Sequence, residues 1–154
     1  MNKAEKSSDQ PSQALVPNKY LLGAFVLFAF IGFLDTSYLT ISHFTGAEVN
    51  CSIVEGCNEV LASKYSSIFG IPLALLGLLH YTILLVGGFY YLDSRNPKVL
   101  KPLMILTTFG LLFSAWLVYL QFFVIKSICQ YCMVSAVNSV ILFIFALILN
   151  SSKK

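Results

Sequence analysis

The sequence predicts an all-α integral membrane protein, a four-transmembrane-helix bundle with a cysteine-containing loop or short helix on the extracytoplasmic side. Hydrophobic residues make up 57% of its 154 residues and charged residues only 11%, whereas about a quarter of the residues in a typical soluble domain are charged. Four segments contain the roughly 20 mostly apolar residues that a helix needs to cross the hydrocarbon core. Short polar stretches separate them, so each segment is expected to be one span.

The chain opens with a polar segment, residues 1–18, which contains two prolines and lacks the apolar periodicity of a packed element. We expect this segment to be a disordered cytoplasmic tail. The first apolar stretch starts only at Tyr20 and is too long to be the core of a cleaved signal peptide. The first helix is therefore expected to remain as a membrane anchor.

The membrane domain is expected over residues 19–150, followed by a short cytoplasmic tail at 151–154. Residues 93–98 form a polar turn in which Pro97 cannot continue a helix. Lys101 and Pro102 then open the third apolar segment. The helices are predicted at about 20–42, 70–92, 102–125 and 129–149.

Basic residues gather at one end of the predicted bundle, and the cytoplasmic side of a membrane protein is the side enriched in lysine and arginine. The basic residues at that end are Lys3, Lys6, Lys19, Arg95, Lys98, Lys101, Lys153 and Lys154. The opposite end has Lys64, Lys126, Glu48, Glu55 and Glu59. Both termini are therefore expected in the cytoplasm, as an even number of spans requires.

The net charge of +3 does not indicate a nucleic-acid partner. A protein that binds nucleic acid needs a continuous basic face. The basic residues here stand instead at the ends of apolar segments, where they orient a membrane protein. The lipid bilayer is the expected environment, and no nucleic-acid partner is expected.

Four cysteines fall on the predicted extracytoplasmic side, where disulfides are tolerated. Cys51 and Cys57 lie in the loop between the first two spans, and Cys129 and Cys132 form a C-x-x-C pair where the fourth span begins. A thiol near the positive end of a helix dipole is a better attacking or leaving group, because its thiolate is stabilised. Two dithiol pairs facing one compartment favour a relay that passes electrons by thiol–disulfide exchange.

Two other interpretations of the cysteines remain open at this point. Four thiolates are a complete ligand set for structural zinc, although four membrane helices already organise this chain and no metal is expected. Two inert disulfides would instead make the protein a non-catalytic membrane module. Since a bridge from Cys51 to Cys57 closes a short loop, it would add little loop-closure stabilisation.

Several motifs together resemble bacterial homologues of vitamin K epoxide reductase. They are the cysteine pair, Ser63 six residues after Cys57, the Ile-Phe-Gly-Ile-Pro run that ends at Pro72, the Cys129-Gln-Tyr-Cys132 pair, and Gly-Phe-Leu-Asp-Thr-Ser-Tyr in the first span. The resemblance covers about residues 20–149. It implies a four-helix bundle around a quinone, ubiquinone or menaquinone, with a short horizontal helix capping the site.

The resemblance also implies an activity and a role for each cysteine. The chain would be a thiol:quinone oxidoreductase of the bacterial cytoplasmic (inner) membrane that supports disulfide bond formation. Its partner would be a separate DsbA-like thioredoxin-fold protein, since the chain stops at Lys154 without a fused thioredoxin-like domain. Cys132 would lie next to the quinone, Cys129 would exchange with Cys57, and Cys51 would exchange with the partner.

Three further residues are candidates for contact with the quinone. Ser63 matches the serine that the family has near its site, and Phe69 of the Ile-Phe-Gly-Ile-Pro run would stack on the ring. The animal enzymes have an asparagine shortly before Ile-Phe-Gly and a tyrosine one turn after C-x-x-C. Ser66 and Ala136 take those places here, which favours ordinary quinone reduction over epoxide reduction.

Two ionisable residues lie inside the predicted spans. Asp35 is a candidate proton relay, because a carboxyl group at membrane depth is expensive to keep there. A structural hydrogen bond to Thr36, Ser37 or a neighbouring helix explains it equally well. His80 is either a proton donor to the quinone or a histidine satisfied by a nearby hydroxyl.

Overall fold

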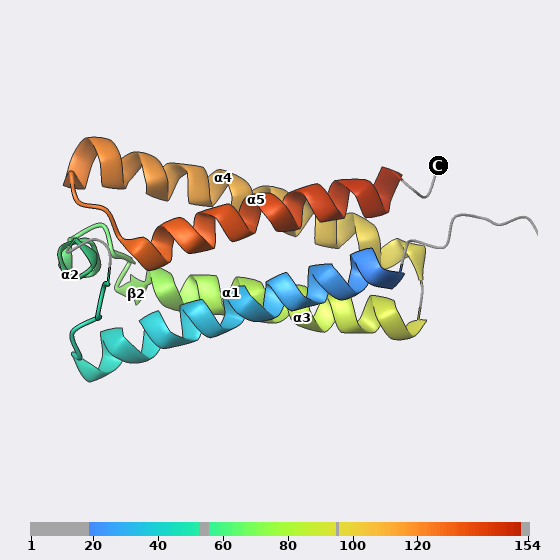
Figure 1. The fold of residues 1–154 in the computed structure, drawn as a ribbon, viewed down its shortest axis with the longest axis horizontal. Coiled ribbons are helices and arrows are strands. Elements are labelled where there is room, and N and C mark those ends of the chain that lie inside the picture. Colours follow the sequence, from blue (N-terminus) through green and yellow to red (C-terminus); the bar gives the residue numbers. More distant parts are fainter. Residues whose placement is uncertain (1–18, 53–55, 95, 152–154) are drawn as a thin grey trace, which may run out of the picture.

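The computed structural model describes residues 19–52, 56–94 and 96–151, and within them it contains four long helices and a small cysteine-bearing cap (Figure 1). The predicted tail 1–18 and the last three residues lie outside the described residues. Glu55 and Arg95 also fall outside them. All four cysteines are described.

The first long helix, α1, spans Lys19–Thr45, a few residues longer at its end than the predicted 20–42. Gly46 follows it with φ +65°. A left-handed residue directly after a helix turns the chain away and exposes the last carbonyls to new partners, and glycine adopts that conformation at little cost. The chain then runs extended toward Cys51.

The cap consists of the short helix α2, Cys57–Ala62, and a hairpin of two-residue strands, β1 at Ser67–Ile68 and β2 at Ile71–Pro72. Figure 1 shows α2 lying across the end of the bundle. The strands pair Ser67 with Pro72 and Ile68 with Ile71. This hairpin corrects the predicted start of the second span, because residues 70–72 belong to the hairpin and not to a helix.

The second long helix, α3, spans Leu73–Ser94, and a 3-10 turn at Pro97–Val99 leads into α4 at Leu100–Tyr119. The helix α4 thus begins before the predicted residue 102, since a proline is tolerated within the first turn of a helix. A π-helical segment, η2 at Leu120–Ile125, continues α4 as far as Lys126. The last helix, α5, spans Gln130–Ser151.

The four long helices form an antiparallel bundle in which α1 packs against α3 and α5, and α4 packs against α5 (Figure 1). The contact between α3 and α4 is the loosest of the sequential pairs. We call the end of the bundle that carries α2 and the hairpin the cysteine end. Both α3 and α5 run away from it, and α1 and α4 run toward it.

Two buried apolar clusters hold the fold together. The larger one fills the half of the bundle far from the cysteine end; it comprises Leu22, Phe25, Ala29, Tyr81, Leu84, Tyr91, Leu100, Leu103, Leu142, Ala146 and Leu149. The smaller one joins the cap to the bundle; it comprises Leu39, Val49, Cys57, Val60 and Cys129. Two cysteines are thus members of the core that attaches the cap.

The outer surface of the bundle is apolar, which confirms the predicted membrane class. Large hydrophobic side chains point outward along every long helix, including Leu27, Val86, Ile105 and Val137, each more than half exposed. A soluble bundle presents polar residues on its outer faces. Four helices are long and apolar enough to cross a membrane, and the protein is a multi-pass membrane protein.

Candidate functional site

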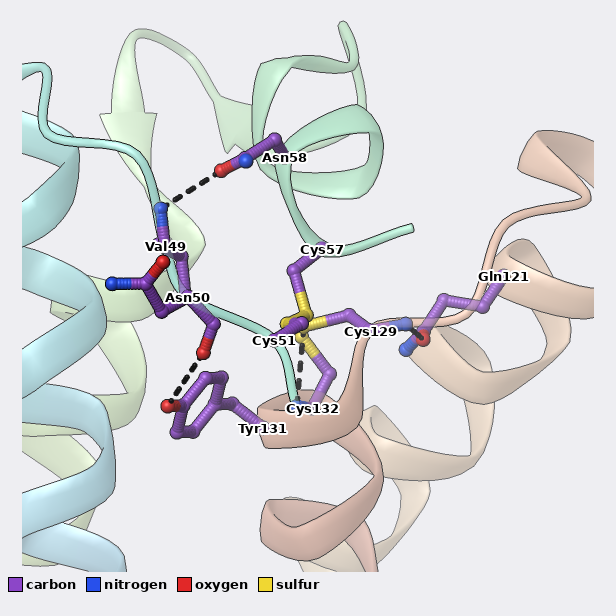
Figure 2. The surroundings of a disulfide bond; sticks show 9 residues. All are labelled: Val49, Asn50, Cys51, Cys57, Asn58, Gln121, Cys129, Tyr131 and Cys132. Atoms are coloured by element: carbon purple, nitrogen blue, oxygen red, sulfur yellow. Dashed lines mark hydrogen bonds between the residues drawn. A yellow bond between two sulfur atoms is a disulfide. The ribbon is translucent and has the colours of Figure 1, made fainter. Parts of the chain in front are cut away.

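The sulfur atoms of all four cysteines gather at the cysteine end (Figure 2). Cys51 and Cys57 form a disulfide with their Cα atoms 6.3 Å apart, while Cys129 and Cys132 are free thiols. Cys57 and Cys129 are fully buried, whereas Cys51 is half-buried. Cys51 is therefore the partly exposed member of the loop pair, and Cys57 lies inside the protein.

Hydrogen bonds fix the extended segment before Cys51. The backbone N–H of Val49 donates to Oδ1 of Asn58 in α2 over 2.9 Å, and the hydroxyl of Tyr131 donates to the carbonyl of Asn50 over 3.2 Å (Figure 2). The Tyr131 ring also packs on Tyr38 of α1, with 5.3 Å between centroids. These contacts hold the loop pair against the start of α5.

Cys129 is the residue directly before α5, and its sulfur caps that helix. The backbone N–H of Cys132 donates to Sγ of Cys129 over 3.3 Å, which is the bond a serine or aspartate oxygen accepts at a helix N-cap. Hydrogen bonds from the Cys132 thiol and from its backbone N–H hold the pKa of the Cys129 thiol below its ordinary value, and they outweigh the burial that raises it. The arrangement favours a thiolate at Cys129.

Gln121 is a site residue that the sequence analysis missed. It lies in the π-helical segment, is 2% exposed, and accepts a hydrogen bond of 2.8 Å from the backbone N–H of Cys129 at Oε1. π-helical turns inside longer helices often occur at functional positions. The signal was the lone amide side chain in an otherwise apolar span.

The loop between η2 and α5 is also tied directly to the cap. The Ser127 hydroxyl donates a hydrogen bond to the Glu59 carboxylate of α2. The backbone of Gly56 lies so close to Ile128 that a Cβ there would be 2.8 Å from the Ile128 N and O atoms. The segment that leads into Cys57 thus packs against the segment that leads into Cys129, at a separation that only glycine allows.

A cavity of about 400 Å³ opens beside Cys132. Its wall is mainly apolar and is built from α1, the cap, α3, α4 and α5. The polar residues predicted from the resemblance to line the site include Ser63 and Ser66, and both line this cavity with Cys132. The Ser63 hydroxyl donates to the Val60 carbonyl over 2.7 Å, and the Ser66 carbonyl accepts from the Leu73 N–H over 2.9 Å.

Phe69 does not line the cavity, which corrects its predicted place at the site. It occupies the tip of the hairpin with φ +53° and is 99% exposed. Phe69 and Gly70 are the two central residues of the turn, and both have positive φ, as in the type I′ turns that suit the twist of a hairpin. The turn geometry therefore directs the Phe69 side chain away from the bundle.

Asp35 lies on α1. Its Oδ2 atom is buried and accepts no hydrogen bond from any described residue, and its carboxyl group acts electrostatically on Cys129. The predicted hydrogen bond to Thr36 or Ser37 is not formed, because both hydroxyls donate instead to backbone carbonyls of the preceding turn. His80, by contrast, lines the cavity.

The described residues contain no group of three or more histidines, cysteines and carboxylates arranged to bind a metal ion. In this state two of the four thiols are joined to each other, so they are not available as zinc ligands. Chemically, the site holds a closed disulfide, a polarised thiol beside it, and a second thiol on a cavity wall. Such a set is suited to thiol–disulfide exchange.

Comparisons with known proteins agree with this geometry. The family model described as the vitamin K epoxide reductase family matches residues 24–147, a stretch that includes all four cysteines. The chain is also similar to the thiol-disulfide oxidoreductase LTO1 of Arabidopsis thaliana, with 33% identity over 118 residues. That match covers 71% of this chain and 31% of the Arabidopsis protein, so the chain spans only about a third of that relative's length.

Proposed function

The chain belongs to the vitamin K epoxide reductase family, and from this premise we propose that it is a membrane thiol oxidoreductase that oxidises a dithiol protein and reduces a quinone. The observation that carries the proposal is the neighbourhood of Cys129. Its buried sulfur lies in one apolar cluster with Cys57 of the closed loop pair, and its C-x-x-C partner Cys132 lines a cavity. Thiol–disulfide exchange among these cysteines would therefore carry electrons from the loop pair to the cavity beside Cys132.

The first step oxidises the partner at the loop pair. A thiolate of the partner attacks Cys51, the partly exposed member of the loop pair, and Cys57 leaves as a thiolate. The second partner thiol then attacks the mixed disulfide and releases Cys51. The partner gains a disulfide, and Cys51 and Cys57 gain the two electrons.

The second step passes those electrons inward. The Cys57 thiolate attacks Cys129 of an oxidised Cys129–Cys132 pair, which forms the Cys57–Cys129 mixed disulfide and releases Cys132. Cys51 then attacks Cys57, so the loop disulfide re-forms and Cys129 leaves as a thiolate. A closed loop pair with a reduced helix pair, the state of this structure, is the product of this step.

The third step closes the Cys129–Cys132 disulfide while two electrons and two protons pass to the quinone, which leaves as quinol. An apolar cavity of about 400 Å³ lies within the size range of small-molecule sites in proteins. Ser63, Ser66 and Cys132 supply polar atoms to its wall. We assign Asp35 the role of a proton relay during quinone reduction, since its buried Oδ2 atom has no hydrogen-bond partner among the described residues.

The proposed partner is a thioredoxin-fold protein of the DsbA type, because such proteins carry an exposed C-x-x-C dithiol that cycles between two states. The proposed location is the bacterial cytoplasmic membrane, with the cysteine end outside the cytoplasm. Ubiquinone and menaquinone are both candidate acceptors, and Ser66 and Ala136 favour quinone over epoxide reduction.

The test is quinone reduction by the purified protein in detergent, supplied with a reduced DsbA-like protein and a short-chain quinone. We expect turnover by the wild type and none by Cys132→Ala. Cys51→Ala, which lacks the thiol that resolves the inner mixed disulfide, should accumulate a Cys57–Cys129 species that peptide mass spectrometry identifies. Met133→Leu, a change one residue away, is the matched control and should turn over like the wild type.

Two results would contradict the proposal. One is the absence of turnover with any thioredoxin-fold donor while the four cysteines resist alkylation after mild reduction, which would indicate inert disulfides. The other is one zinc ion bound per chain by the reduced protein, with loss of the fold on chelation. Either result would favour a non-catalytic membrane module.

A further inference from the structure

The polar side chains on the cavity wall fall into two groups. One lies at the cysteine end and includes Ser63, Ser66 and Cys132. The other lies deeper in the bundle and consists of His80, Tyr81, Ser114, Ser135 and Ser139, which also line the cavity. The mechanism proposed above uses only the first group.

The depth of the second group follows from helix geometry. Ser139 comes seven residues after Cys132 on α5, and His80 comes seven residues after Leu73 at the start of α3. Both helices run away from the cysteine end (Figure 1). At 1.5 Å per residue, each side chain is displaced by roughly 10 Å along its helix, toward the middle of the membrane.

The hydroxyl groups of the deep group satisfy one another. The Tyr81 hydroxyl lies 3.1 Å from Oγ of Ser135 and 3.3 Å from Oγ of Ser139. The Ser114 hydroxyl donates to Oγ of Ser139 over 3.0 Å, and Ser139 donates to the Ser135 carbonyl over 3.0 Å. These groups are a closed network with its own partners.

His80 is different, because neither of its ring nitrogens has a hydrogen-bond partner among residues 19–52, 56–94 and 96–151. The ring is half-buried and lies on an apolar wall. A polar group in an apolar, water-poor setting is costly unless something bonds to it. The ligand of the cavity is the partner that could do so.

The His80 ring is held in place by its neighbours. It lies against the backbone of Gly110 in α4, where an added Cβ would be 2.7 Å from Cε1 and would also clash with Nε2. The Tyr81 ring meets it edge-on, with 5.4 Å between centroids. A glycine on the facing helix thus makes room for an imidazole at this depth, and the contact fixes the ring before a ligand arrives.

We propose that His80 donates a hydrogen bond to the quinone oxygen that lies farther from Cys132, and so binds and orients the electron acceptor. The inference rests on the function proposed above. A para-quinone has an oxygen at each end of its ring, and with one polar contact at each end it spans roughly 10 Å. Cys132 serves one end, and the imidazole N–H serves the other.

The experiment compares His80→Leu, His80→Gln and Thr82→Val with the wild type, using short-chain ubiquinone and short-chain menaquinone as probes. Thr82 is the matched control, since it is a nearby polar residue of α3 whose hydroxyl donates to the Leu78 carbonyl and which does not line the cavity. We expect His80→Leu to raise the KM for quinone about tenfold and to change kcat by less than about threefold, because one buried hydrogen bond is lost. His80→Gln keeps a donor and should lie within about threefold of the wild type.

A spectroscopic measurement separates quinone contact from a structural role. Infrared spectra of bound quinone labelled with ¹³C at its carbonyl carbons should show one carbonyl band shifted to lower frequency in the wild type and in Thr82→Val, and that shift should be absent in His80→Leu. Exchange of the cysteines with the reduced partner, measured without quinone, should be the same in all four proteins.

An unchanged KM and an unchanged carbonyl band in His80→Leu, in a wild-type protein that does bind and reduce quinone, would overturn the role of His80 alone. Failure of the wild type to bind either quinone would overturn the proposed function and this inference together. If His80→Leu also loses thiol exchange, the variant is misfolded and His80→Gln decides. Glutamine that binds quinone like the wild type and keeps the band shift supports the inference, and glutamine that lacks both overturns it.

Discussion

At the scale of single residues, Cys129 has two features of interest: it caps the start of α5, and it is a free thiol of the C-x-x-C pair. Its sulfur accepts the N–H of Cys132 at the start of α5, as a capping oxygen does. The same bond lowers the energy of the thiolate relative to the thiol, since a donor favours the charged acceptor. The residue that directly precedes α5 is thereby suited to the proposed exchange with Cys57.

This arrangement predicts a pH dependence that a pair of variants can isolate. The hydrogen bond from the Cys132 thiol is the largest cause of the lowered pKa of Cys129. Cys132→Ser keeps a side-chain donor and Cys132→Ala does not, while both keep the backbone N–H. Because a donor stabilises the thiolate, Cys129 should deprotonate at a lower pH in Cys132→Ser than in Cys132→Ala.

The measurement is the thiolate absorbance near 240 nm as pH is raised, with the Cys51–Cys57 disulfide closed so that Cys129 is the single free thiol in each variant. Equal midpoints in the two variants, or a lower midpoint in the alanine variant, would show that the hydroxyl does not reach the sulfur. The same titration of a Cys129→Ala, Cys132→Ala double variant, which has no free thiol, supplies the baseline.

At the scale of elements, the contact between α1 and α3 depends on one small residue. Tyr81 of α3 lies against Gly32 of α1, and a Cβ on Gly32 would overlap the Tyr81 ring. Tyr81 is 2% exposed and carries the hydroxyl that joins the serine network of α5. The position of a polar group on the cavity wall is therefore set by a glycine on another helix.

Gly32→Ala should consequently destabilise the bundle, by about 1–3 kcal/mol if the added methyl group is accommodated by displacement of Tyr81. Gly23→Ala, on the same helix, is the matched control because a Cβ there meets nothing within 4 Å. Removing a glycine from a helix without a clash should leave stability unchanged or raise it by up to about 1 kcal/mol.

Thermal unfolding in one detergent, followed by circular dichroism, compares the two variants with the wild type. Equal unfolding midpoints for both alanine variants would mean that the contact between α1 and α3 accommodates the added methyl group at no cost in free energy, contrary to the packing described. The quinone KM of Gly32→Ala is a second readout, since displacement of Tyr81 alters the cavity wall.

At the scale of the whole molecule, charge divides the bundle into two unlike ends. Among the described residues, Lys19, Lys98 and Lys101 lie at the end opposite the cysteines. The cysteine end has Lys64 and Lys126, with Glu59 beside Ser127. Since basic residues favour the cytoplasmic side, this asymmetry predicts that the cysteine end faces outward.

Cysteine labelling in spheroplasts tests that orientation. In a variant with all four cysteines replaced by alanine, we expect a membrane-impermeant maleimide to label Thr45→Cys at the cysteine end of α1 in intact spheroplasts. Asn96→Cys, at the opposite end, should be labelled only after lysis. Both positions are exposed in the structure, so they differ in side and not in burial. The reverse pattern would place the thiols in the cytoplasm and contradict the proposed partner.

Part of the site followed from the sequence because its residues are local. The C-x-x-C pair stands where an apolar span begins, so its place at the start of α5 required no tertiary contact. Ser63 and Ser66 were predicted from a resemblance and do line the cavity. Phe69 was assigned with them because it shares their motif, and the turn at Phe69–Gly70 sends it elsewhere. Sequence proximity does not fix side-chain direction within a hairpin.

The sequence by itself determined the membrane class, the four spans and the shared end of the four cysteines, because the hydrophobic length of a helix and the polarity of a turn are local properties. Only the tertiary structure decided which groups meet: Gln121 with the backbone of Cys129, Gly56 with Ile128, and His80 with Gly110. It also decided that α3 and α4, which pack loosely against each other, both contribute to the wall of one cavity. These features depend on how side chains of distant segments share space, and that close packing is not encoded in any one stretch of the chain.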